Sequence, residues 1–448
     1  MKRLLFKELK KWKDSKVRLP LILKGARQVG KTWLLKEFGK TCFKDVFYIN
    51  FEQTSDMNDV FAGDIQPQRI IDYLTAIHGK KIDAHNTLII FDEVQEVPRA
   101  LSSLKSFAEQ APEYTICCAG SLLGIALHQN TSFPVGKVEF LTLQPFSFEE
   151  FLLANNEQEL IDFIKNYTLQ NFPITIYNKL TDYLKQYFII GGMPSAVLAW
   201  INTRDYAEVE KKQKEILMAY EQDFSKHAPK NLVPKIRHIW NSIPSQLAKE
   251  NKKFIYGLIK ESARAREYED ALLWLFDSGL IRNVSRITKP SLPLKSYEDL
   301  KSFKIYHLDI GLLRTMSELS PKVIIEKVKI FEEFKGALTE QFVLQELSVI
   351  TECQNVYYWK SDATAEIDFI LSYFTNVLPV EVKASENLQS KSLKLYREKF
   401  HPKLSVRISL SNLEYNNDLL NVPLYALFNL LNYIETIFKN SIKDGKQK

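Results

Sequence analysis

The residue types best suited to chemistry lie near the N-terminus, where the pattern G-x-x-x-x-G-K-T runs from Gly25 to Thr32. An apolar stretch that begins at Leu19 precedes it and a helical pattern begins at Trp33, which is the strand, loop and helix context that this motif requires. The glycines let successive backbone N–H groups face a chain of phosphates, and the helix N-terminus adds partial positive charge. The pattern favours a nucleotide-binding loop over an accidental glycine turn. The expected binding residues are Gly25, Ala26, Arg27, Gln28, Val29, Gly30, Lys31, Thr32 and Trp33.

Two residues of this loop have specific expected roles, and a second segment supports them. Lys31 is expected to reach the β- and γ-phosphates, and Thr32 to ligate magnesium. Four apolar residues of the segment Thr87–Glu93 lead into Asp92 and Glu93, as in a central parallel strand that delivers carboxylates to its C-terminal edge. Asp92 is expected to hold magnesium through water and Glu93 to polarise the attacking water; the alternative is a solvated strand cap. ATP and Mg²⁺ are therefore the expected cofactors.

A third apolar segment begins at Thr115 and ends in Ser121. At the end of a neighbouring parallel strand, Ser121 could sense the γ-phosphate or the attacking water. A turn serine that caps the next helix fits the same pattern, and both interpretations stay open. With this residue included, the expected catalytic set is Lys31, Asp92, Glu93 and Ser121.

A second constellation lies near the C-terminus. Residues two apart on a strand share a face, so Glu381 and Lys383 of the segment Leu378–Lys383 point together, and Asp368 on the preceding strand can join them. Glu340 on the helix before these strands is a further acid. This layout is that of a PD-(D/E)xK nuclease core, in which carboxylates hold a second metal and the lysine positions or activates water. A structural ion-pair cluster is the alternative, as is a domain that binds phosphate without cleaving.

Strands and helices that would position these residues follow in four segments. Strands alternate with helices over residues 1–150, which predicts an α/β nucleotide-binding domain. Residues 151–230 have helical, aromatic-rich patterns that predict a helical lid. Residues 231–295 are expected to hold three short helices, one of them at 254–259, and then a strand, as in a winged-helix module. Residues 296–448 hold the second constellation. Basic residues of the third segment that could meet phosphates are Lys252, Lys253, Arg264 and Arg266.

Composition restricts the function classes only loosely. The 448 residues include 60 basic and 54 acidic side chains, a formal net charge of +6 that permits nucleic-acid contact without requiring it. The four cysteines have no ligand-like spacing and are expected to be reduced and mostly buried. No apolar run approaches the roughly 20 residues needed to span a bilayer, and no signal peptide is apparent. We expect a cytoplasmic protein without a membrane span.

Five segments together are specific to one family. They are Gly-Ala-Arg-Gln-Val-Gly-Lys-Thr at 25–32, Phe-Asp-Glu-Val-Gln at 91–95, Ala-Gly-Ser at 119–121, Gln-Pro-Phe-Ser-Phe-Glu-Glu-Phe at 144–151 and Gly-Gly-Met-Pro at 191–194. With these motifs nearly the whole chain resembles the bacterial and archaeal AAA-family P-loop ATPases that carry an uncharacterised C-terminal domain. The resemblance implies an α/β fold with an AAA-like core built on a parallel sheet. It also implies a helical and winged-helix middle and a C-terminal α/β domain of the restriction-endonuclease type.

One departure from the family affects a catalytic role. Family members usually carry an arginine after the glycine that precedes the 144–151 block, whereas this chain has Gly136-Lys137. Lysine lacks the planar fork with which arginine grips phosphate, so an arginine-finger role at this position is not expected. Arg99 is a further candidate, in its own subunit or toward a neighbouring one, and a surface arginine without a catalytic role is the preferred alternative.

Three functions follow from these expectations. In the first, ATP turnover moves domains that engage duplex DNA. In the second, the chain is a nucleotide-dependent switch that recruits a protein partner or a second copy and never meets nucleic acid. In the third, it is an ATP-regulated DNA nuclease. Steep loss of duplex binding with rising salt would favour the first over the second.

Overall fold

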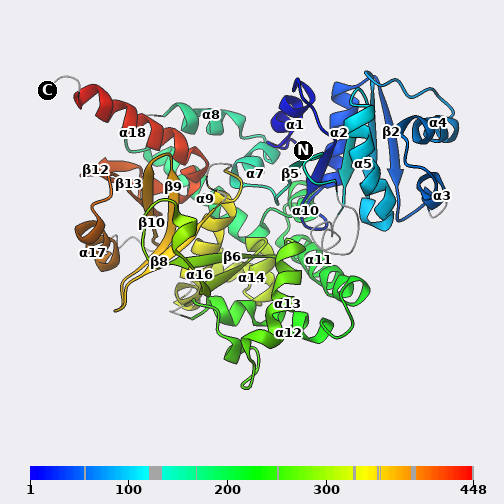
Figure 1. The fold of residues 1–448 in the computed structure, drawn as a ribbon. Helices are drawn as coiled ribbons and strands as arrows, with labels where there is room; N and C mark the ends of the chain where they lie inside the picture. The colour runs from blue at the N-terminus through cyan, green and yellow to red at the C-terminus, as the bar shows by residue number, and fades with distance from the viewer. Residues whose placement is uncertain are drawn as a thin grey trace. The chain divides into compact units, whose positions relative to one another are not determined.

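We describe a computed structural model of the chain. It places residues 1–54, 57–120, 134–167, 169–249, 252–325, 329–350, 353, 355–384 and 390–445. The chain forms two compact units, which are described separately (Figure 1). The first unit comprises Met1–Gln144 and Leu273–Leu280, and the second comprises Pro145–Leu272 and Ile281–Lys448.

The first unit is built on a five-stranded parallel sheet. Its strands are β1 (Leu21–Lys24), β2 (Asp45–Asn50), β3 (Thr87–Asp92), β4 (Thr115–Ala119) and β5 (Glu139–Thr142). They lie in the order β2-β3-β4-β1-β5, and every pairing is parallel. Because all five strands end at one edge, the loop after β1 and the carboxylates that end β3 share that edge. The predicted α/β fold with a parallel sheet is confirmed.

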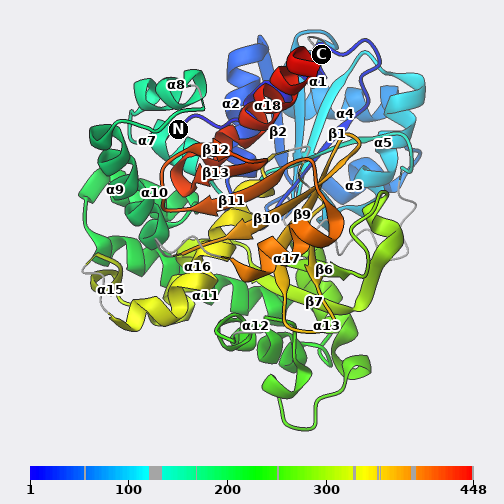
Figure 2. The same cartoon turned by 90° about the vertical axis from the view of Figure 1, so that its left-hand side faces the viewer.

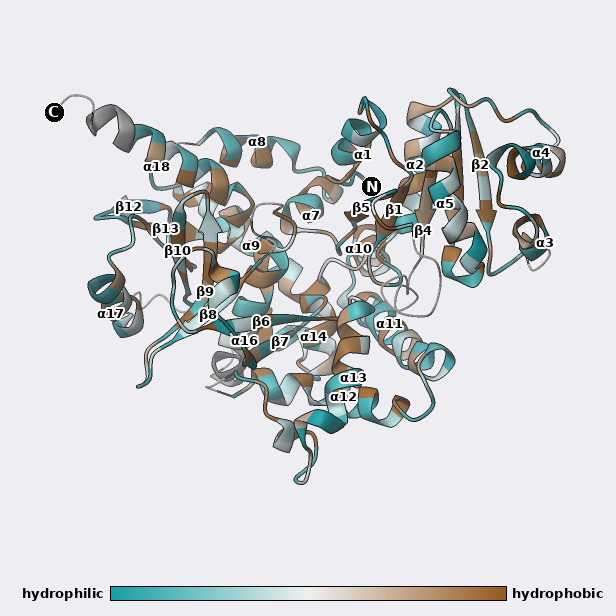
Figure 3. Cartoon of the chain, in the orientation of Figure 1, coloured by the Kyte–Doolittle hydropathy of each residue, from teal (hydrophilic) through white to brown (hydrophobic). Residues whose placement is uncertain are grey.

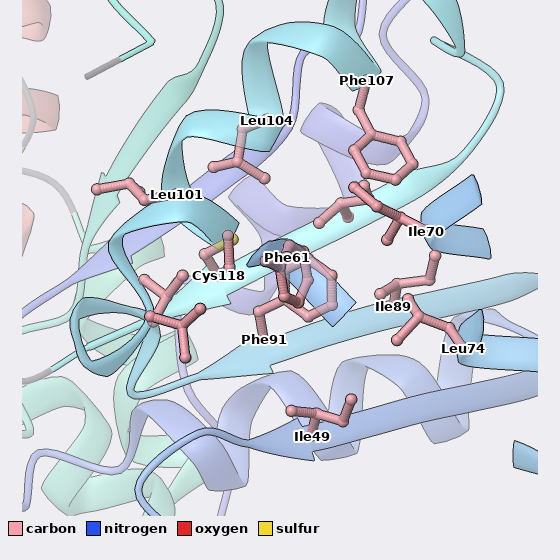
Figure 4. Packing of buried hydrophobic residues seen from close by; sticks show 14 of the residues in the cluster. Ile49, Phe61, Ile70, Leu74, Ile89, Phe91, Leu101, Leu104, Phe107 and Cys118 are labelled. Carbon is pink, nitrogen blue, oxygen red and sulfur yellow. The ribbon is translucent and has the colours of Figure 1, made fainter. Parts of the chain in front are cut away.

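Helices on this sheet bury continuous apolar runs. They are α1 (Phe6–Lys13), α2 (Lys31–Cys42), α3 (Met57–Ala62), α4 (Pro67–His78) and α5 (Pro98–Gln110), with a 3₁₀ turn η1 (Val94–Glu96). Every residue of β3 is buried, as expected for a central parallel strand covered on both faces. Phe61 of α3 packs edge-to-face on Phe91 of β3, with ring centroids 5.8 Å apart (Figure 4). This packing fixes the end of β3 that carries Asp92.

The second unit begins with the expected helical region. Its helices are α7 (Phe148–Ala154), α8 (Gln158–Asn166), α9 (Ile174–Ile190), α10 (Pro194–Thr203) and α11 (Tyr206–His227). The Ser147 side chain accepts from the Glu150 backbone N–H and the Glu150 side chain accepts in return, so a capping box starts α7. Residues 148–227 are thus mainly helical, which is compatible with the helical region predicted over 151–230.

The region expected to be a winged helix follows this helical part. It contains α12 (Val233–Leu247), a 3₁₀ turn η2 (Tyr256–Leu258), α13 (Ala265–Asp277) and the antiparallel pair β6 (Ile281–Ile287) and β7 (Glu298–His307). The helix predicted over 254–259 is wrong beyond its short 3₁₀ turn. Phe254 instead donates its backbone N–H to Phe303 of β7, and Gln246 bonds both backbone groups of Ile255, so the chain is extended there. The division expected at residue 295 falls between two strands of one hairpin.

An eight-stranded sheet joins this hairpin to the C-terminal part. The order is β12-β13-β11-β10-β9-β8-β6-β7, and Figure 2 shows β13, β11, β10 and β9 side by side. The further strands are β8 (Tyr357–Lys360), β9 (Glu366–Tyr373), β10 (Asn376–Val382), β11 (Ser405–Ser409), β12 (Glu414–Asn416) and β13 (Leu419–Pro423). The helical elements are η3 (Leu294–Tyr297), α14 (Ile310–Met316), α15 (Pro321–Ile325), α16 (Lys329–Leu347), α17 (Lys391–Phe400), η5 (Leu424–Asn429) and α18 (Leu430–Gly445). A C-terminal α/β architecture is therefore present.

Candidate functional site

The loop after β1 has the backbone that its glycine spacing predicts. Gly25 and Gly30 adopt φ of 143° and 95°, a region that L side chains rarely enter. A Cβ on Gly25 would also lie less than 3.0 Å from the Leu143 carbonyl oxygen. Gly30 is the N-cap of α2, so the loop passes directly into the N-terminus of a helix. Curled backbone and a helix N-terminus together form a site for phosphate groups.

Lys31 is held inside this loop. Its ammonium donates to the carbonyl oxygens of Gly25, at 2.8 Å, and Ala26, at 2.9 Å. Burial lowers the pKa of Lys31 to about 8, although the carboxylates of Glu93 and Asp92 oppose this shift. At neutral pH the side chain therefore keeps a buried positive charge among the groups that would surround phosphate.

Asp92 is the electrostatic centre of the strand edge, with only 2% of its surface exposed. Its Oδ2 accepts from the Thr32 hydroxyl at 2.6 Å and from the Tyr48 hydroxyl at 3.0 Å. Its Oδ1 accepts from the Glu93 backbone N–H at 3.1 Å. The structure thus brings together the two residues predicted to serve magnesium. A hydroxyl and a carboxylate are the oxygen donors that Mg²⁺ prefers, so these residues fit the ion.

Glu93 lies just beyond the strand with a left-handed backbone, at φ 51°. Its Oε2 accepts from the Gln95 amide at 2.7 Å. A non-glycine residue in this conformation is costly, and such strain is concentrated at functional sites. Ser121, the remaining predicted catalytic residue, lies outside the described residues.

Two residues of this site were missed by sequence reasoning. Tyr48 of β2 bonds Asp92, and burial, followed by the Asp92 charge, raises its pKa to about 12. Arg3 is 7% exposed and donates to the carbonyl oxygens of Val29, at 3.0 Å, and Gln144, at 2.5 Å. The alternating pattern of Asp45–Asn50 could have indicated Tyr48, because β2 ends at the same sheet edge. Nothing distinguishes Arg3 from its basic neighbours in the sequence.

The structure also places other residues predicted for the nucleotide-binding loop and the two positions considered for an arginine finger. Trp33 is 45% exposed at the start of α2, and Arg27 is half-buried. Arg99 donates to the carbonyl oxygens of Phe61, at 2.6 Å, and Gly63, at 2.5 Å. Lys137 pairs with Glu109 at 3.0 Å. Arg99 and Lys137 therefore stabilise the first unit in this structure.

In the second unit, the acids of the C-terminal constellation do lie together. Asp368 is half-buried and accepts from the Val382 backbone N–H at 2.8 Å. Burial raises its pKa well above the usual range, and the nearby charges of Glu340 and Glu381 raise it further. Glu381 pairs with Lys383 at 2.8 Å and accepts from the Ser390 hydroxyl at 2.7 Å. The predicted Asp368, Glu381 and Lys383 grouping is thus present, with Asp368 favouring the neutral acid.

Two lysines that the sequence analysis did not connect with this cluster neutralise it. Lys304 of β7 is 1% exposed, with its ammonium 2.6 Å from Glu366 and 3.9 Å from Glu340. Lys252 also pairs with Glu340. Burial alone would raise the pKa of Glu340, but these two ammonium groups outweigh it and lower the pKa. Conversely, Glu340 and Glu366 raise the pKa of Lys304 despite its burial.

The cluster as it stands does not fit a metal ion. Within the described part of the chain, no group of three His, Cys, Asp or Glu side chains is arranged to hold one. Instead, lysine ammonium groups occupy the carboxylate oxygens of Glu340, Glu366 and Glu381. A buried cation beside several acids serves the electrostatic purpose that a metal would serve. The second metal site remains a prediction from the sequence, and no chemistry is derived through it.

Comparison with known proteins assigns the first part of the chain. Residues 17–152 match a family model described as "AAA domain", and this stretch contains the loop, Asp92 and Glu93. Most of the first unit therefore matches the AAA domain model, which supports nucleotide binding at this loop. Residues 181–323 match a "Domain of unknown function (DUF8612)" and residues 335–427 a "Domain of unknown function (DUF4143)". The last residues of the AAA match, 145–152, belong to the second unit of the structure.

Similar whole proteins and solved structures are distant. The uncharacterised proteins Mb2031c of Mycobacterium bovis and Rv2008c of Mycobacterium tuberculosis are each 22% identical over 369 residues, covering 81% of this chain and 70% of theirs. The Walker-type ATPase PABY2304 of Pyrococcus abyssi is 14% identical at a TM-score of 0.44, covering 69% of this chain and 94% of that one. AMPPCP-bound DnaA of Aquifex aeolicus is 16% identical at a TM-score of 0.27, with coverages of 77% and 92%.

The Gly-Gly-Met-Pro turn has a structural explanation in the unit that follows the AAA domain. Gly192 donates its N–H to Asp309 at 2.6 Å, and its carbonyl accepts from the Phe146 N–H at 2.7 Å. A Cβ on Gly192 would lie less than 3.0 Å from the Phe146 carbonyl oxygen. Gln345 of α16 also bonds Asp309, at 3.2 Å, and the Tyr187 hydroxyl, at 2.9 Å. The turn therefore connects Phe146, near the start of the second unit, to a buried polar network around Asp309.

The basic residues of the predicted winged helix divide into two groups. Lys252 is committed to Glu340, and Lys253 forms a backbone bridge to Lys304 of β7. Arg264 and Arg266, at the start of α13, are exposed. The arginines are thus the members of this set that lie open to solvent.

No helix among the placed residues is long and apolar enough to cross a membrane.

Proposed function

We propose that this chain is a magnesium-dependent ATPase whose turnover repositions domains that engage DNA. The observation that carries the ATPase part is the hydrogen bond between Thr32 and Asp92 at 2.6 Å. It places the predicted metal-binding hydroxyl and carboxylate beside a loop that holds a buried lysine. The AAA match over residues 17–152 supports nucleotide binding and hydrolysis independently.

Each residue of the site has a step that its surroundings allow. The loop from Gly25 to Gly30 would bind phosphate oxygens through backbone N–H groups. Lys31 would leave the carbonyls of Gly25 and Ala26 and follow the stronger negative charge of the β- and γ-phosphates. When bound, Mg²⁺ supplies a Lewis acid that neutralises charge on the phosphates. Glu93, oriented by Gln95, would accept a proton from the attacking water. Ser121 remains a predicted sensor of the γ-phosphate.

Features of the segment from α12 to β7 support the DNA-engaging part. We infer a winged helix from the order α12, extended segment, η2, α13 and β6–β7 hairpin, in which Lys253 bridges to β7 as a short first strand would. In helix-turn-helix proteins, a helix of this kind enters the major groove. Exposed Arg264 and Arg266 at the start of α13 are positioned to meet phosphates. These features favour DNA over a purely protein-binding switch.

Steady-state phosphate release, with and without Mg²⁺ and duplex DNA, tests the proposal. Lys31→Ala should abolish nucleotide binding. Glu93→Gln should keep binding but lower kcat about 10²- to 10⁴-fold, the usual contribution of a general base. Exposed Glu96→Gln is the matched control, because it removes a neighbouring charge outside the site. If Glu93→Gln turned over like the Glu96→Gln control, the assigned role of Glu93 would be refuted.

Two alternatives keep specific support. An ATP-regulated nuclease rests on the grouping of Asp368, Glu381 and Lys383, while the neutralising lysines weigh against it. Mg²⁺-dependent plasmid cleavage that an Asp368→Asn/Glu381→Gln variant loses would establish it. A protein switch would instead show phosphate release and no duplex binding at low salt.

Arg99 and Lys137 make their contacts within the first unit, so we propose that an activating arginine would come from a partner or a second copy. We propose a cytoplasmic location for either form.

A further inference from the structure

A hollow of about 690 Å³ lies on the second unit between α17 and strands β11 and β13. Residues of α17, of the turn after it and of β11 form most of its described lining. Figure 3 shows α17 mostly in the hydrophilic colour. None of these residues belongs to the ATP site.

The lining is strongly cationic. Among the described lining residues, the carboxylates are Glu398 and Asp418. The basic side chains are Lys394, Arg397, His401, Lys403 and Arg407. With His401 neutral, the described part of the lining therefore holds four cations and two anions. Such an excess of positive charge in a concave surface raises the local concentration of anions.

The two arginines are held in place rather than freely mobile. Arg397 donates to the carbonyl oxygen of Asn417, and Arg407 donates through Nε to the Asn421 amide oxygen at 2.8 Å. Arg407 is half-buried on β11. These contacts orient each guanidinium group, and a planar guanidinium matches two oxygens of a phosphate.

The hollow is poorly suited to an apolar cofactor. Sites for drug-sized ligands are lined mainly by hydrophobic and aromatic side chains. Among the described residues that line this hollow, none is Phe, Tyr or Trp. Without aromatic faces, bases cannot be stacked, so recognition would rest on charge and phosphate geometry. Lys394, whose side chain is 80% exposed, and exposed Lys403 leave the hollow open to a continuous strand.

Its position gives the hollow a relation to the C-terminal cluster. Arg407 of β11 is the register partner of Glu381 on β10. Ser390 lines the hollow and donates its hydroxyl to Glu381 at 2.7 Å. A phosphate chain lying in the hollow would therefore run past the acidic cluster on the same sheet.

We propose that this hollow binds the phosphodiester backbone of DNA without reading its sequence. The inference rests on the proposed DNA-engaging function and assigns it a surface on α17 and β11. Bound DNA would contact the protein at Arg397, Lys403 and Arg407. Because contacts to phosphate carry no sequence information, binding through this surface depends on salt and is indifferent to base composition.

Fluorescence anisotropy of labelled duplexes with the full-length chain tests the assignment over about 50 to 200 mM salt. The main variant is Arg397→Gln/Lys403→Gln, and Lys403→Gln alone removes only an exposed side chain should the double variant misfold. Lys40→Gln/Lys81→Gln is the matched control, because it removes two exposed charges from the first unit. Arg407→Lys keeps the charge but removes the fork. ATP hydrolysis and the melting temperature of each variant report on the first unit and on folding.

The main variant should lose about tenfold or more in duplex affinity, with the slope of log affinity against log salt reduced by about 2, since each phosphate contact contributes about 0.9. The control should keep the wild-type slope, and two duplexes of different sequence should behave alike. Wild-type binding that the main variant and Lys403→Gln both retain in full would overturn the hollow as the contact surface. Absence of wild-type binding at low salt would overturn the DNA part of the proposed function instead. Tripolyphosphate binding that Arg407→Lys weakens, without duplex binding, would overturn DNA as the occupant in favour of a soluble phosphate.

Discussion

Replacing Lys304 tests whether the C-terminal cluster is neutralised from within. The ammonium group of Lys304 is buried, and it lies 2.6 Å from Glu366 and 3.9 Å from Glu340. Lys304→Ala removes that charge and leaves room for another cation. Lys304→Met removes the charge while filling most of the volume, so the two variants separate electrostatics from packing.

The expected loss follows from the geometry. Breaking a buried ion pair by removing one partner costs about 3 to 5 kcal/mol, because the other charge stays buried and uncompensated. Lys252 still pairs with Glu340 in the variants, which favours the lower end, about 3 kcal/mol. The lysines lower the pKa of Glu340, so their stabilisation is present above the ordinary glutamate pKa of about 4.5 and is lost as pH falls through the lowered value. The difference between wild type and variant should therefore shrink in acid.

Urea unfolding of the full chain, followed by tryptophan fluorescence with and without Mn²⁺ in the absence of nucleotide, measures both effects. Trp359 of β8 and Trp240 of α12 report on the second unit. Mn²⁺ should stabilise Lys304→Ala more than wild type or Lys304→Met. Only the alanine variant both removes the ammonium group from the carboxylates and leaves space for the ion. A loss below about 1 kcal/mol, the range of surface ion pairs, would refute the buried-neutralisation argument. So would Mn²⁺ stabilisation of wild type that Asp368→Asn abolishes.

Four further outcomes follow from single contacts. Arg3→Ala should raise the KM for ATP about tenfold, because it removes a buried charged hydrogen bond to the phosphate loop that is worth about 1.5 to 3 kcal/mol. Arg3→Lys should restore part of the lost affinity. An unchanged KM of Arg3→Ala in steady-state assays would contradict the role of Arg3 in shaping the loop. Nucleotide titrations should show the ATP Kd rising about tenfold per pH unit above pH 8, because Lys31 with a pKa of about 8 must then take up a proton on binding. Gly192→Ala should destabilise by about 1 to 3 kcal/mol in thermal unfolding, while Gly257→Ala, which meets only a side chain at 3.9 Å, should not. Burial raises the pKa of Glu346 to about 8, so the free energy of unfolding of the wild type should fall as pH rises from about 4.5 through 8. Glu346→Gln should flatten this dependence of stability on pH. Parallel pH curves for the two proteins would contradict the raised pKa.

The AAA site was largely predictable from the sequence because its parts are local motifs placed by a general rule. The phosphate loop needs eight consecutive residues, and the conformations of Gly25 and Gly30 follow from glycine's freedom at positive φ. Parallel strands end at one edge, so Thr32 and Asp92 had to be neighbours although they are sixty positions apart in the chain. The same rule places Tyr48 near Asp92, because β2 is parallel to β3. Tyr48 was missed because the contribution of β2 to the site was not considered.

Errors arose where tertiary contacts override local propensity. Residues 254–259 have a helical pattern, yet Gln246 and Phe303 take up the backbone groups of Phe254 and Ile255. The chain there pairs with β7 instead of bonding to itself. Likewise, no local signal showed that β6 continues into the C-terminal sheet through its parallel pairing with β8. Pairings between distant segments have no signature within either segment.

The C-terminal cluster shows why a nuclease-like pattern alone does not establish a nuclease. The pattern places Asp368, Glu381 and Lys383 on adjoining strands, and the structure agrees. Whether these acids serve a metal depends on cations supplied from elsewhere, and Lys304 comes from β7, more than sixty positions before Asp368. The sequence did contain a signal, because Lys304 lies between Phe303 and Ile305, and a charge flanked by apolar residues on a strand must be paired if it is buried. A buried lysine beside such a cluster favours an electrostatically closed domain, in which the half-buried arginines and exposed lysines of the α17 hollow, rather than the acids, would meet DNA.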